Sequence, residues 1–178
     1  MKNYHAWQYR QWLLPNYSLW SNELNFIDEL LQNDVRNNSA WNQRYFVIAH
    51  TTGFKDDIIE RELDYVEKRI FTYPDNESAW NYLRGLGRLR SLNLTDQRLW
   101  KFCQNLYDNY YLKDDLNSQQ WRFLLAYMIE LLIDDDREEK RSENQKFIQQ
   151  LCEQLVLKID PIRKKYWQYI QEQQNIQT

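Results

Sequence analysis

The pattern Asn-x-x-x-Trp-x-x-Arg recurs along the chain and limits the possible folds more than any other feature of the sequence. Two copies are complete, with Asn3, Trp7 and Arg10 in the first and Asn37, Trp41 and Arg44 in the second. A third, degenerate copy begins at Asn76 and Trp80 and has Leu83 where the others have arginine. The copies start 34 and 39 residues apart, an interval typical of repeats made of two helices. The sequence therefore predicts an all-α fold of the α-α superhelix class, a solenoid of antiparallel helical hairpins.

Each residue type in the pattern has a structural interpretation. The asparagine can cap a helix by accepting a backbone N–H, and the residues four and seven positions later share one face of that helix. We expect Trp7, Trp41 and Trp80 to fill the core of the repeats rather than to contact a substrate. Arg10 and Arg44 are expected to bind backbone or acidic groups at the repeat junction, with phosphate as the alternative ligand.

The rest of the chain agrees with paired helices. Leu, Glu, Gln, Arg and Lys are abundant, whereas the sequence has three glycines and three prolines, a balance that favours helices. Apolar residues at helical spacing run from Trp20 to Leu31 and from Ile59 to Ile70. We expect about nine helices in a single domain, 1–178, with repeats near 3–33, 37–72 and 76–111 and degenerate helices over 118–173.

Two prolines mark helix boundaries in this pattern. Pro15 is expected to end the first helix, and the pair at 160–161, Asp-Pro, is a start signal for the last one. That last helix carries Ile162, Tyr166 and Ile170 at helical spacing, which predicts that these side chains share its apolar face.

Charge, hydropathy and cysteine content argue against several classes of protein. The formal net charge is −3, the sequence pI is about 5.5 and there is no basic tract, so nucleic acid is not an expected partner. No apolar run approaches the roughly 20 residues that span a bilayer, and the N-terminus lacks a signal-peptide pattern, so we expect a cytoplasmic protein. Cys103 and Cys152 stand far apart without a metal-binding motif and are expected to be buried, reduced thiols. His50 has no identifiable partner in the sequence and is assigned no role.

Three blocks of sequence resemble a known family. They are KNYHAWQYRQWLL from Lys2, VRNNSAWNQRYFVI from Val35 and NESAWNYLRG from Asn76. Their residues and their order along the chain are similar to those of the protein prenyltransferase α-subunit repeats. The similarity is greatest to the C-terminal part of the α subunit shared by protein farnesyltransferase and type I geranylgeranyltransferase. The resemblance is dense to about Gly85 and thin through the next seventy residues. The α subunit of Rab geranylgeranyltransferase shares the repeat but resembles these blocks less well, and it stays as an alternative.

The resemblance implies a crescent of helical hairpins around a β subunit. The family enzyme transfers farnesyl or geranylgeranyl from its diphosphate to the cysteine of proteins that end in Cys-aliphatic-aliphatic-X. In that family the β subunit carries the zinc and sets the choice of prenyl group, so no cofactor is expected on this chain, while magnesium can accompany the diphosphate. The expected partners are the β subunit, the prenyl diphosphate and the protein substrate.

The resemblance also implies a site at the start of the first block. In the family this Asn-Tyr-His lies near the diphosphate, which carries over to Asn3, Tyr4 and His5, with Tyr4 and His5 as hydrogen-bond donors to the leaving group. From the residues alone, without the family resemblance, His5 would be interpreted as an ordinary histidine on the surface of a helix. No residue is assigned a catalytic role beyond this donor set.

In one respect the sequence departs from the family. The repeat that precedes the block at Lys2 in the family supplies a lysine that reaches the diphosphate, and the printed sequence begins at that block. Either the sequence is a piece of a longer protein or the upstream repeats have been lost. Two functions therefore stay open, an enzyme subunit that is inactive alone and a non-catalytic helical-repeat scaffold for protein interactions.

Overall fold

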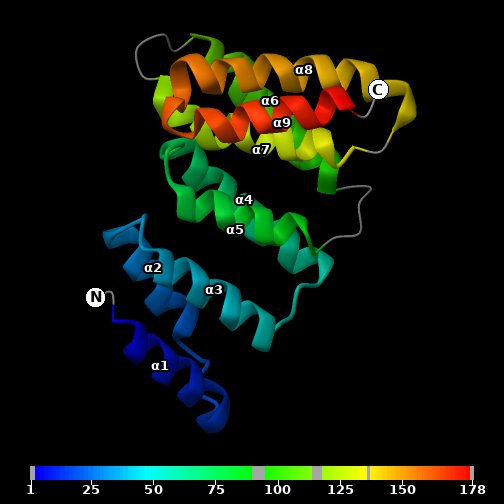
Figure 1. Ribbon diagram of the computed structural model, residues 1–178. Coiled ribbons are helices and arrows are strands. Elements are labelled where there is room, and N and C mark those ends of the chain that lie inside the picture. The colour runs from blue at the N-terminus through cyan, green and yellow to red at the C-terminus, as the bar shows by residue number, and fades with distance from the viewer. Residues whose placement is uncertain (1–2, 90–94, 114–117, 136, 177–178) are drawn as a thin grey trace. The chain divides into compact units, whose positions relative to one another are not determined.

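The computed structural model describes residues 3–89, 95–113, 118–135 and 137–176, and in these residues the chain is helical without any strand (Figure 1). The described residues form nine α-helices: α1 Tyr4–Tyr17, α2 Glu23–Asn33, α3 Asn38–His50, α4 Asp56–Thr72, α5 Glu77–Gly87, α6 Thr95–Asn109, α7 Arg122–Ile133, α8 Arg141–Gln154 and α9 Lys164–Ile176. Short 3-10 turns and one π-helical turn, Leu155–Ile159, complete the described part. The all-α prediction with about nine helices is confirmed.

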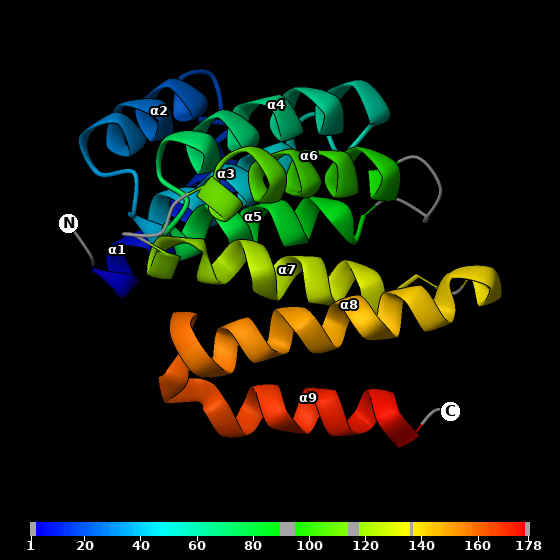
Figure 2. The same cartoon turned by 90° about the horizontal axis from the view of Figure 1, so that it is seen from above.

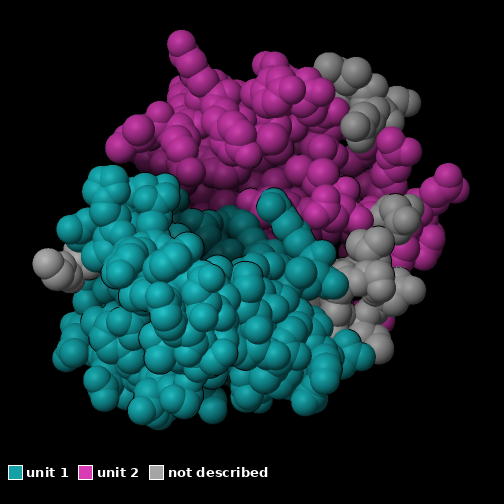
Figure 3. All heavy atoms as spheres, turned by 90° about the horizontal axis from the view of Figure 1, so that it is seen from below, with its two compact units in different colours: residues 1–91 teal, residues 92–178 magenta. Residues whose placement is uncertain are grey.

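The chain divides into two compact units, residues 1–91 and 92–178 (Figure 3). The predicted third repeat, near 76–111, crosses this division and includes residues 90–94, which lie outside the described residues. The assignment of 1–178 to one repeat domain stays a prediction.

The first unit is built from two layers of helices. The first helices of the three repeats, α1, α3 and α5, pack in a row, α1 against α3 and α3 against α5. The second helices, α2 and α4, cover this row, with α2 on α3 and α4 on α5 (Figure 2). The second helix of each complete repeat thus packs against the first helix of the next repeat.

The core of the first unit follows the apolar spacing of the sequence. Fully or nearly fully buried side chains come from every helix of the unit: Leu14, Ile27, Leu31, Trp41, Val47, Ile48, Ile59, Leu63, Val66, Ile70, Trp80, Leu83 and Leu86. Trp20 lies before the start of α2 and stacks on the ring of His50, at the end of α3, with their centroids 6.2 Å apart. Helical spacing therefore predicted the core well and the start of α2 less well.

The prediction that Pro15 ends the first helix is wrong, because α1 continues through Pro15 to Tyr17. Proline lacks an N–H, so its presence removes only one helical hydrogen bond, and the chain turns instead at Ser18, which has a left-handed φ of 54°. The N–H of Leu19 then returns to the carbonyl of Leu14. After α3, the turn is made by Gly53, with φ of 67°, a conformation that glycine adopts without a Cβ penalty.

The second unit packs α6 on α7, α7 on α8 and α8 on α9. Helix α7 is its centre, because every side chain from Phe123 to Ile129 is buried. Cys103 and Cys152 are buried free thiols, as the sequence predicted. No described helix has the length and apolarity required to cross a membrane.

The predicted apolar face of the last helix is wrong. The Asp-Pro pair opens a 3-10 turn, Pro161–Arg163, and α9 begins after it. Ile162 is 97% exposed and Tyr166 is half exposed, whereas Trp167 is buried. The Nε1–H of Trp167 donates to the buried carboxylate of Asp160 at 3.0 Å, so the buried face of α9 is the one that carries Trp167, which apolar spacing alone did not indicate.

Candidate functional site

The predicted donor set Asn3-Tyr4-His5 lies at the N-terminus of α1, and all three residues are exposed. Asn3 caps the helix, since its Oδ1 accepts the N–H of His5 at 3.0 Å and the N–H of Ala6 at 3.4 Å. The rings of Tyr4 and His5 meet edge to face with centroids 5.8 Å apart. A phenol and an imidazole therefore stand together at a helix N-terminus, where the helix dipole favours a negative charge.

A buried carboxylate holds α1 to the next helices. Glu23, at the start of α2, receives the Arg10 guanidinium in a bidentate contact, with Nε at 2.7 Å and Nη2 at 2.6 Å. Gln43 of α3 donates from its Nε2 to the same carboxylate at 2.8 Å. Arg10 also lies over the ring of Phe26, 4.1 Å from its centroid, and Trp7 is half-buried against that ring. The arginine of the first repeat thus binds an acid at the repeat junction.

The second repeat has the same arrangement. Arg44 of α3 binds Glu62 of α4 with Nε at 2.6 Å and Nη2 at 3.0 Å, and its Nη1 donates to Asp28 of α2 at 2.9 Å. The hydroxyl of Tyr82, on α5, donates to Glu62 at 2.8 Å. Tyr82 and Gln43 each stand two residues after the repeat tryptophan, so each links its repeat to the glutamate of the preceding one.

Arg44 and Glu62 both remain ionised although their side chains are buried. Burial alone would lower the pKa of Arg44 and raise the pKa of Glu62, but their hydrogen bonds and mutual attraction outweigh burial and move each pKa in the opposite direction. Burial, and then the neighbouring Glu62 charge, raise the pKa of Tyr82 well above its ordinary value. Its hydroxyl therefore keeps the proton that it donates to Glu62.

The third repeat replaces this ion pair with apolar packing. Leu83, in the arginine position, is fully buried, and Arg84 one residue later donates to Asn81 at 3.1 Å. Asn76 still caps its helix, accepting the N–H of Ser78 at 3.2 Å, and Trp80 still donates from Nε1, to the carbonyl of Pro74 at 2.8 Å. The cap and the tryptophan are thus kept in the copy that lacks the arginine.

Sequence reasoning missed the two glutamates, Glu23 and Glu62. They follow their arginines by different intervals because Glu23 is the first residue of α2 whereas Glu62 lies in the second turn of α4, so no fixed motif contains them. The sequence feature that marks both glutamates is an acidic residue on the apolar face of the second helix of a repeat, where an unpaired charge would be unfavourable. His50, left without a role, stacks on Trp20 and Phe46 and has its Nδ1 2.8 Å from the carbonyl of Phe46.

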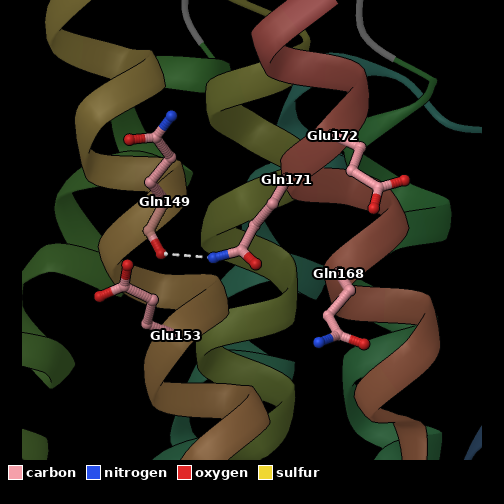
Figure 4. Close-up of a pocket in the computed structure, with 5 residues that line it drawn as sticks. All are labelled: Gln149, Glu153, Gln168, Gln171 and Glu172. Carbon is pink, nitrogen blue, oxygen red and sulfur yellow. Dashed lines mark hydrogen bonds between the residues drawn. The ribbon is translucent and has the colours of Figure 1, made fainter.

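A separate polar groove of about 490 Å³ lies between α8 and α9 in the second unit (Figure 4). Its walls are formed by three amides and two carboxylates, those of Gln149, Glu153, Gln168, Gln171 and Glu172. The Nε2 of Gln171 donates to the backbone carbonyl of Gln149 at 3.3 Å, which joins the two helices. Among the residues described, no group of three or more His, Cys, Asp or Glu side chains could hold a metal ion.

Comparison with known proteins gives one consistent family. Residues 1–17, 20–51 and 59–88 match the family Protein prenyltransferase alpha subunit repeat. The chain is 35% identical over 155 residues to the protein farnesyltransferase/geranylgeranyltransferase type-1 subunit alpha of Dictyostelium discoideum, which covers 86% of this chain and 44% of that protein. It is 26% identical over 187 residues to the geranylgeranyl transferase type-2 subunit alpha of Saccharomyces cerevisiae, covering 97% of this chain and 57% of that protein.

A solved structure agrees with these relatives. A chain of Candida albicans protein geranylgeranyltransferase-I, complexed with GGPP, is 31% identical and superimposes with a TM-score of 0.77. The similarity covers 97% of this chain and 54% of that one, and it confirms the α-α superhelix fold class. The chain spans about half the length of the curated relatives that it matches.

Proposed function

Because this chain is a member of the protein prenyltransferase α-subunit repeat family, we propose that it acts in the α subunit of a heterodimeric protein prenyltransferase. The partner is a β subunit, and the reaction transfers farnesyl or geranylgeranyl to the cysteine of a protein with a C-terminal Cys-aliphatic-aliphatic-X sequence. The observation that carries the proposal is the exposed Asn3-Tyr4-His5 set, in a chain 35% identical to type-1 α subunits over most of its length.

The contribution of this chain to the chemistry is stabilisation of the leaving group. As the substrate thiolate forms a bond to the prenyl carbon, the bond from that carbon to oxygen breaks and its electron pair leaves with the diphosphate. The hydroxyl of Tyr4 and the ring N–H of His5 donate to the growing negative charge. Asn3 keeps its Oδ1 on the N–H groups of His5 and Ala6, and so fixes the first turn of α1 from which both donors project.

The thiolate and the prenyl chain are handled by the partner. Zinc, which activates a thiolate by lowering its pKa, does not fit the described residues of this chain, so we assign it to the β subunit. Magnesium, where used, binds with the diphosphate. The helical layers of the first unit bind and support the β subunit. The α chain alone does not transfer prenyl groups. The α/β complex acts in the cytoplasm.

The test is co-purification of the natural α subunit that contains this sequence with type I and farnesyltransferase β subunits. We expect single-turnover transfer from geranylgeranyl or farnesyl diphosphate to a Cys-aliphatic-aliphatic-X peptide in the heterodimer, and none from the α chain alone. A heterodimer that forms but fails to bind prenyl diphosphate would favour the scaffold function. Activity only with a Rab geranylgeranyltransferase β subunit would assign the chain to type 2, which its lower identity of 26% to the yeast protein does not favour.

A further inference from the structure

Glu23 connects the helix that carries the donor set to the body of the first unit. Its side chain is only 2% exposed, and its two oxygens accept hydrogen bonds from Arg10 of α1 and from Gln43 of α3. We propose that Glu23 is a positioning residue for prenyl transfer, because it fixes the position of α1 and thereby the orientation of Tyr4 and His5 toward the diphosphate. This inference rests on the function proposed above.

Helix α1 has few other contacts that could fix its first half. The one fully buried residue of α1 is Leu14, which lies near the C-terminal end of the helix. Tyr4, His5 and Ala6 are exposed and Trp7 is half-buried against Phe26, so apolar packing anchors the first turns only in part. Near the middle of the helix, Gln11 Nε2 donates to Gln43 at 3.1 Å, a neutral hydrogen bond. The bidentate ion pair with Glu23 is therefore the strongest polar constraint on the half of α1 that carries the donors.

The distance from the ion pair to the donors is short. Arg10 is five residues after His5, about 7.5 Å along the helix axis, so a shift at Arg10 is carried directly to the donor end. The bidentate contact fixes both the height and the rotation of Arg10, since its planar guanidinium meets both oxygens of the carboxylate at 2.6 and 2.7 Å. Stacking of Arg10 over Phe26 holds the same orientation.

The geometry of Glu23 explains why a change there would move the helix. The Nε and Nη2 groups of Arg10 and the Nε2 group of Gln43 are all donors that point at its carboxylate oxygens. In a Glu23→Gln variant one of these oxygens becomes an NH2 group, which faces donors and cannot accept from them. Arg10 is 39% exposed, so its guanidinium can turn toward water once the carboxylate is lost, and α1 is released to move with it.

The second repeat provides a matched control. Glu62 binds Arg44 with the same bidentate geometry and receives Tyr82 where Glu23 receives Gln43. It joins α3, α4 and α5, because its hydrogen-bond partners among the described residues belong to these helices and not to α1. A change at Glu62 or Arg44 therefore weakens the unit by a similar mechanism, without a direct route to Tyr4 and His5.

The experiment compares two pairs of variants in the purified α/β complex. Arg10→Lys and Glu23→Gln disturb the first junction, and Arg44→Lys and Glu62→Gln disturb the second. For each we measure the affinity for geranylgeranyl diphosphate, the single-turnover rate at saturation and the midpoint of thermal unfolding. We expect the first pair to slow transfer by roughly tenfold or more and the second pair by less than about twofold, even where the second pair unfolds at a lower temperature. Arg10→Lys keeps the positive charge, so it serves if Glu23→Gln does not fold.

A double-mutant cycle separates positioning from general stability. If Glu23 acts through the donors, Arg10→Lys has less than about a twofold further effect when Tyr4→Phe and His5→Ala are already present. Equal rate losses from the two junctions, or full additivity with the donor variants, would overturn the positioning role. A wild-type complex that does not bind geranylgeranyl diphosphate at all would instead overturn the proposed function, and the two failures are thus distinguishable.

Discussion

Trp41 and Asn76 donate to the same acceptor, the backbone carbonyl of Val35, with the Trp41 Nε1 and the Asn76 Nδ2 each 2.8 Å from its oxygen. Trp41 belongs to the second repeat and Asn76 caps the first helix of the third. The turn before α3 is therefore fixed both by the tryptophan that follows it and by the cap of the next repeat. Two residues of the recurring pattern thus hold neighbouring repeats together as well as shaping their own helices.

We expect Trp41→Ala to lower the free energy of unfolding by about 3 to 5 kcal/mol, because it leaves a cavity in the core and an unpaired carbonyl lone pair at Val35. Trp12→Ala is the matched control, since Trp12 is 52% exposed and stacks on Tyr9 at the surface. That control should cost less than about 1 kcal/mol. Urea titrations of both variants provide the comparison, and equal losses would place Trp41 outside the core.

A second prediction separates the two functions of Asn76. Asn76→Asp keeps an oxygen to cap the N–H of Ser78 but replaces the Nδ2 donor to Val35 with a second acceptor. We expect a loss of about 1 to 3 kcal/mol in unfolding free energy, because this donor and its acceptor are partly buried. Asn3→Asp is the control, as its oxygen caps α1 in the same way at an exposed site and Asp caps as well as Asn. If Asn76→Asp leaves the free energy of unfolding unchanged, only the helix cap contributes to stability at this position.

Glu62→Gln should be among the most destabilising polar changes in the chain, about 3 to 5 kcal/mol at neutral pH, because the buried charge of Arg44 loses its bidentate partner and keeps only the partly exposed Asp28. The same pair makes stability depend on pH. Burial alone would raise the pKa of Glu62, but the Arg44 hydrogen bond and charge lower it below the ordinary value of 4.5. The stabilisation is therefore complete above that value and is lost as the pH falls through the lowered pKa of the folded state.

Denaturant titrations between about pH 5 and about pH 3 test this dependence. The wild-type protein should lose stability across this range more steeply than the Glu62→Gln variant, because the variant no longer takes up a proton at this position on unfolding. Parallel curves that differ only by a constant would show that Glu62 does not carry the acid sensitivity.

The thiols of the second unit should be inert in the folded protein. Cys103 and Cys152 are both fully buried, and burial raises the pKa of Cys152 to about 12, so very little thiolate exists near neutral pH. We expect labelling by an aromatic disulfide reagent only after unfolding, at the rate at which the denaturant opens the unit. Rapid labelling of a thiol without denaturant would indicate local opening around α6 or α8.

The sequence predicts the first unit in detail because its signals are local. Asn caps and tryptophans at a fixed spacing give the first helices, and apolar spacing gives Ile59 to Ile70 in α4. The partners of Arg10 and Arg44 were not predictable as residues, because Glu23 and Glu62 come from other helices at unequal intervals. Those contacts depend on how the helices pack, which no single segment of sequence encodes.

The last helix shows a different limit. Apolar spacing through Ile162 and Tyr166 predicted its buried face, yet Trp167 is buried instead. Burial of the large Trp167 ring, together with its hydrogen bond to the buried carboxylate of Asp160, outweighs the burial of one isoleucine. The donor set at the start of α1 is the reverse case, since Tyr4 and His5 were expected from family resemblance and nothing in local spacing marks them.

The final prediction concerns His5 in the active α/β complex. The imidazole stands exposed at the first turn of α1, edge to face with Tyr4 at 5.8 Å between ring centroids. Loss of one donor to the developing diphosphate charge should slow single-turnover prenyl transfer by roughly tenfold to a hundredfold in His5→Ala, while binding of the peptide substrate is largely kept. His50→Ala is the matched control, because the other histidine of the chain stacks on Trp20 and Phe46 and does not lie at the N-terminus of α1. Its removal can lower the unfolding temperature but should leave the transfer rate at saturation within about twofold. A His5→Ala complex as fast as wild type would return His5 to the role of an ordinary surface histidine.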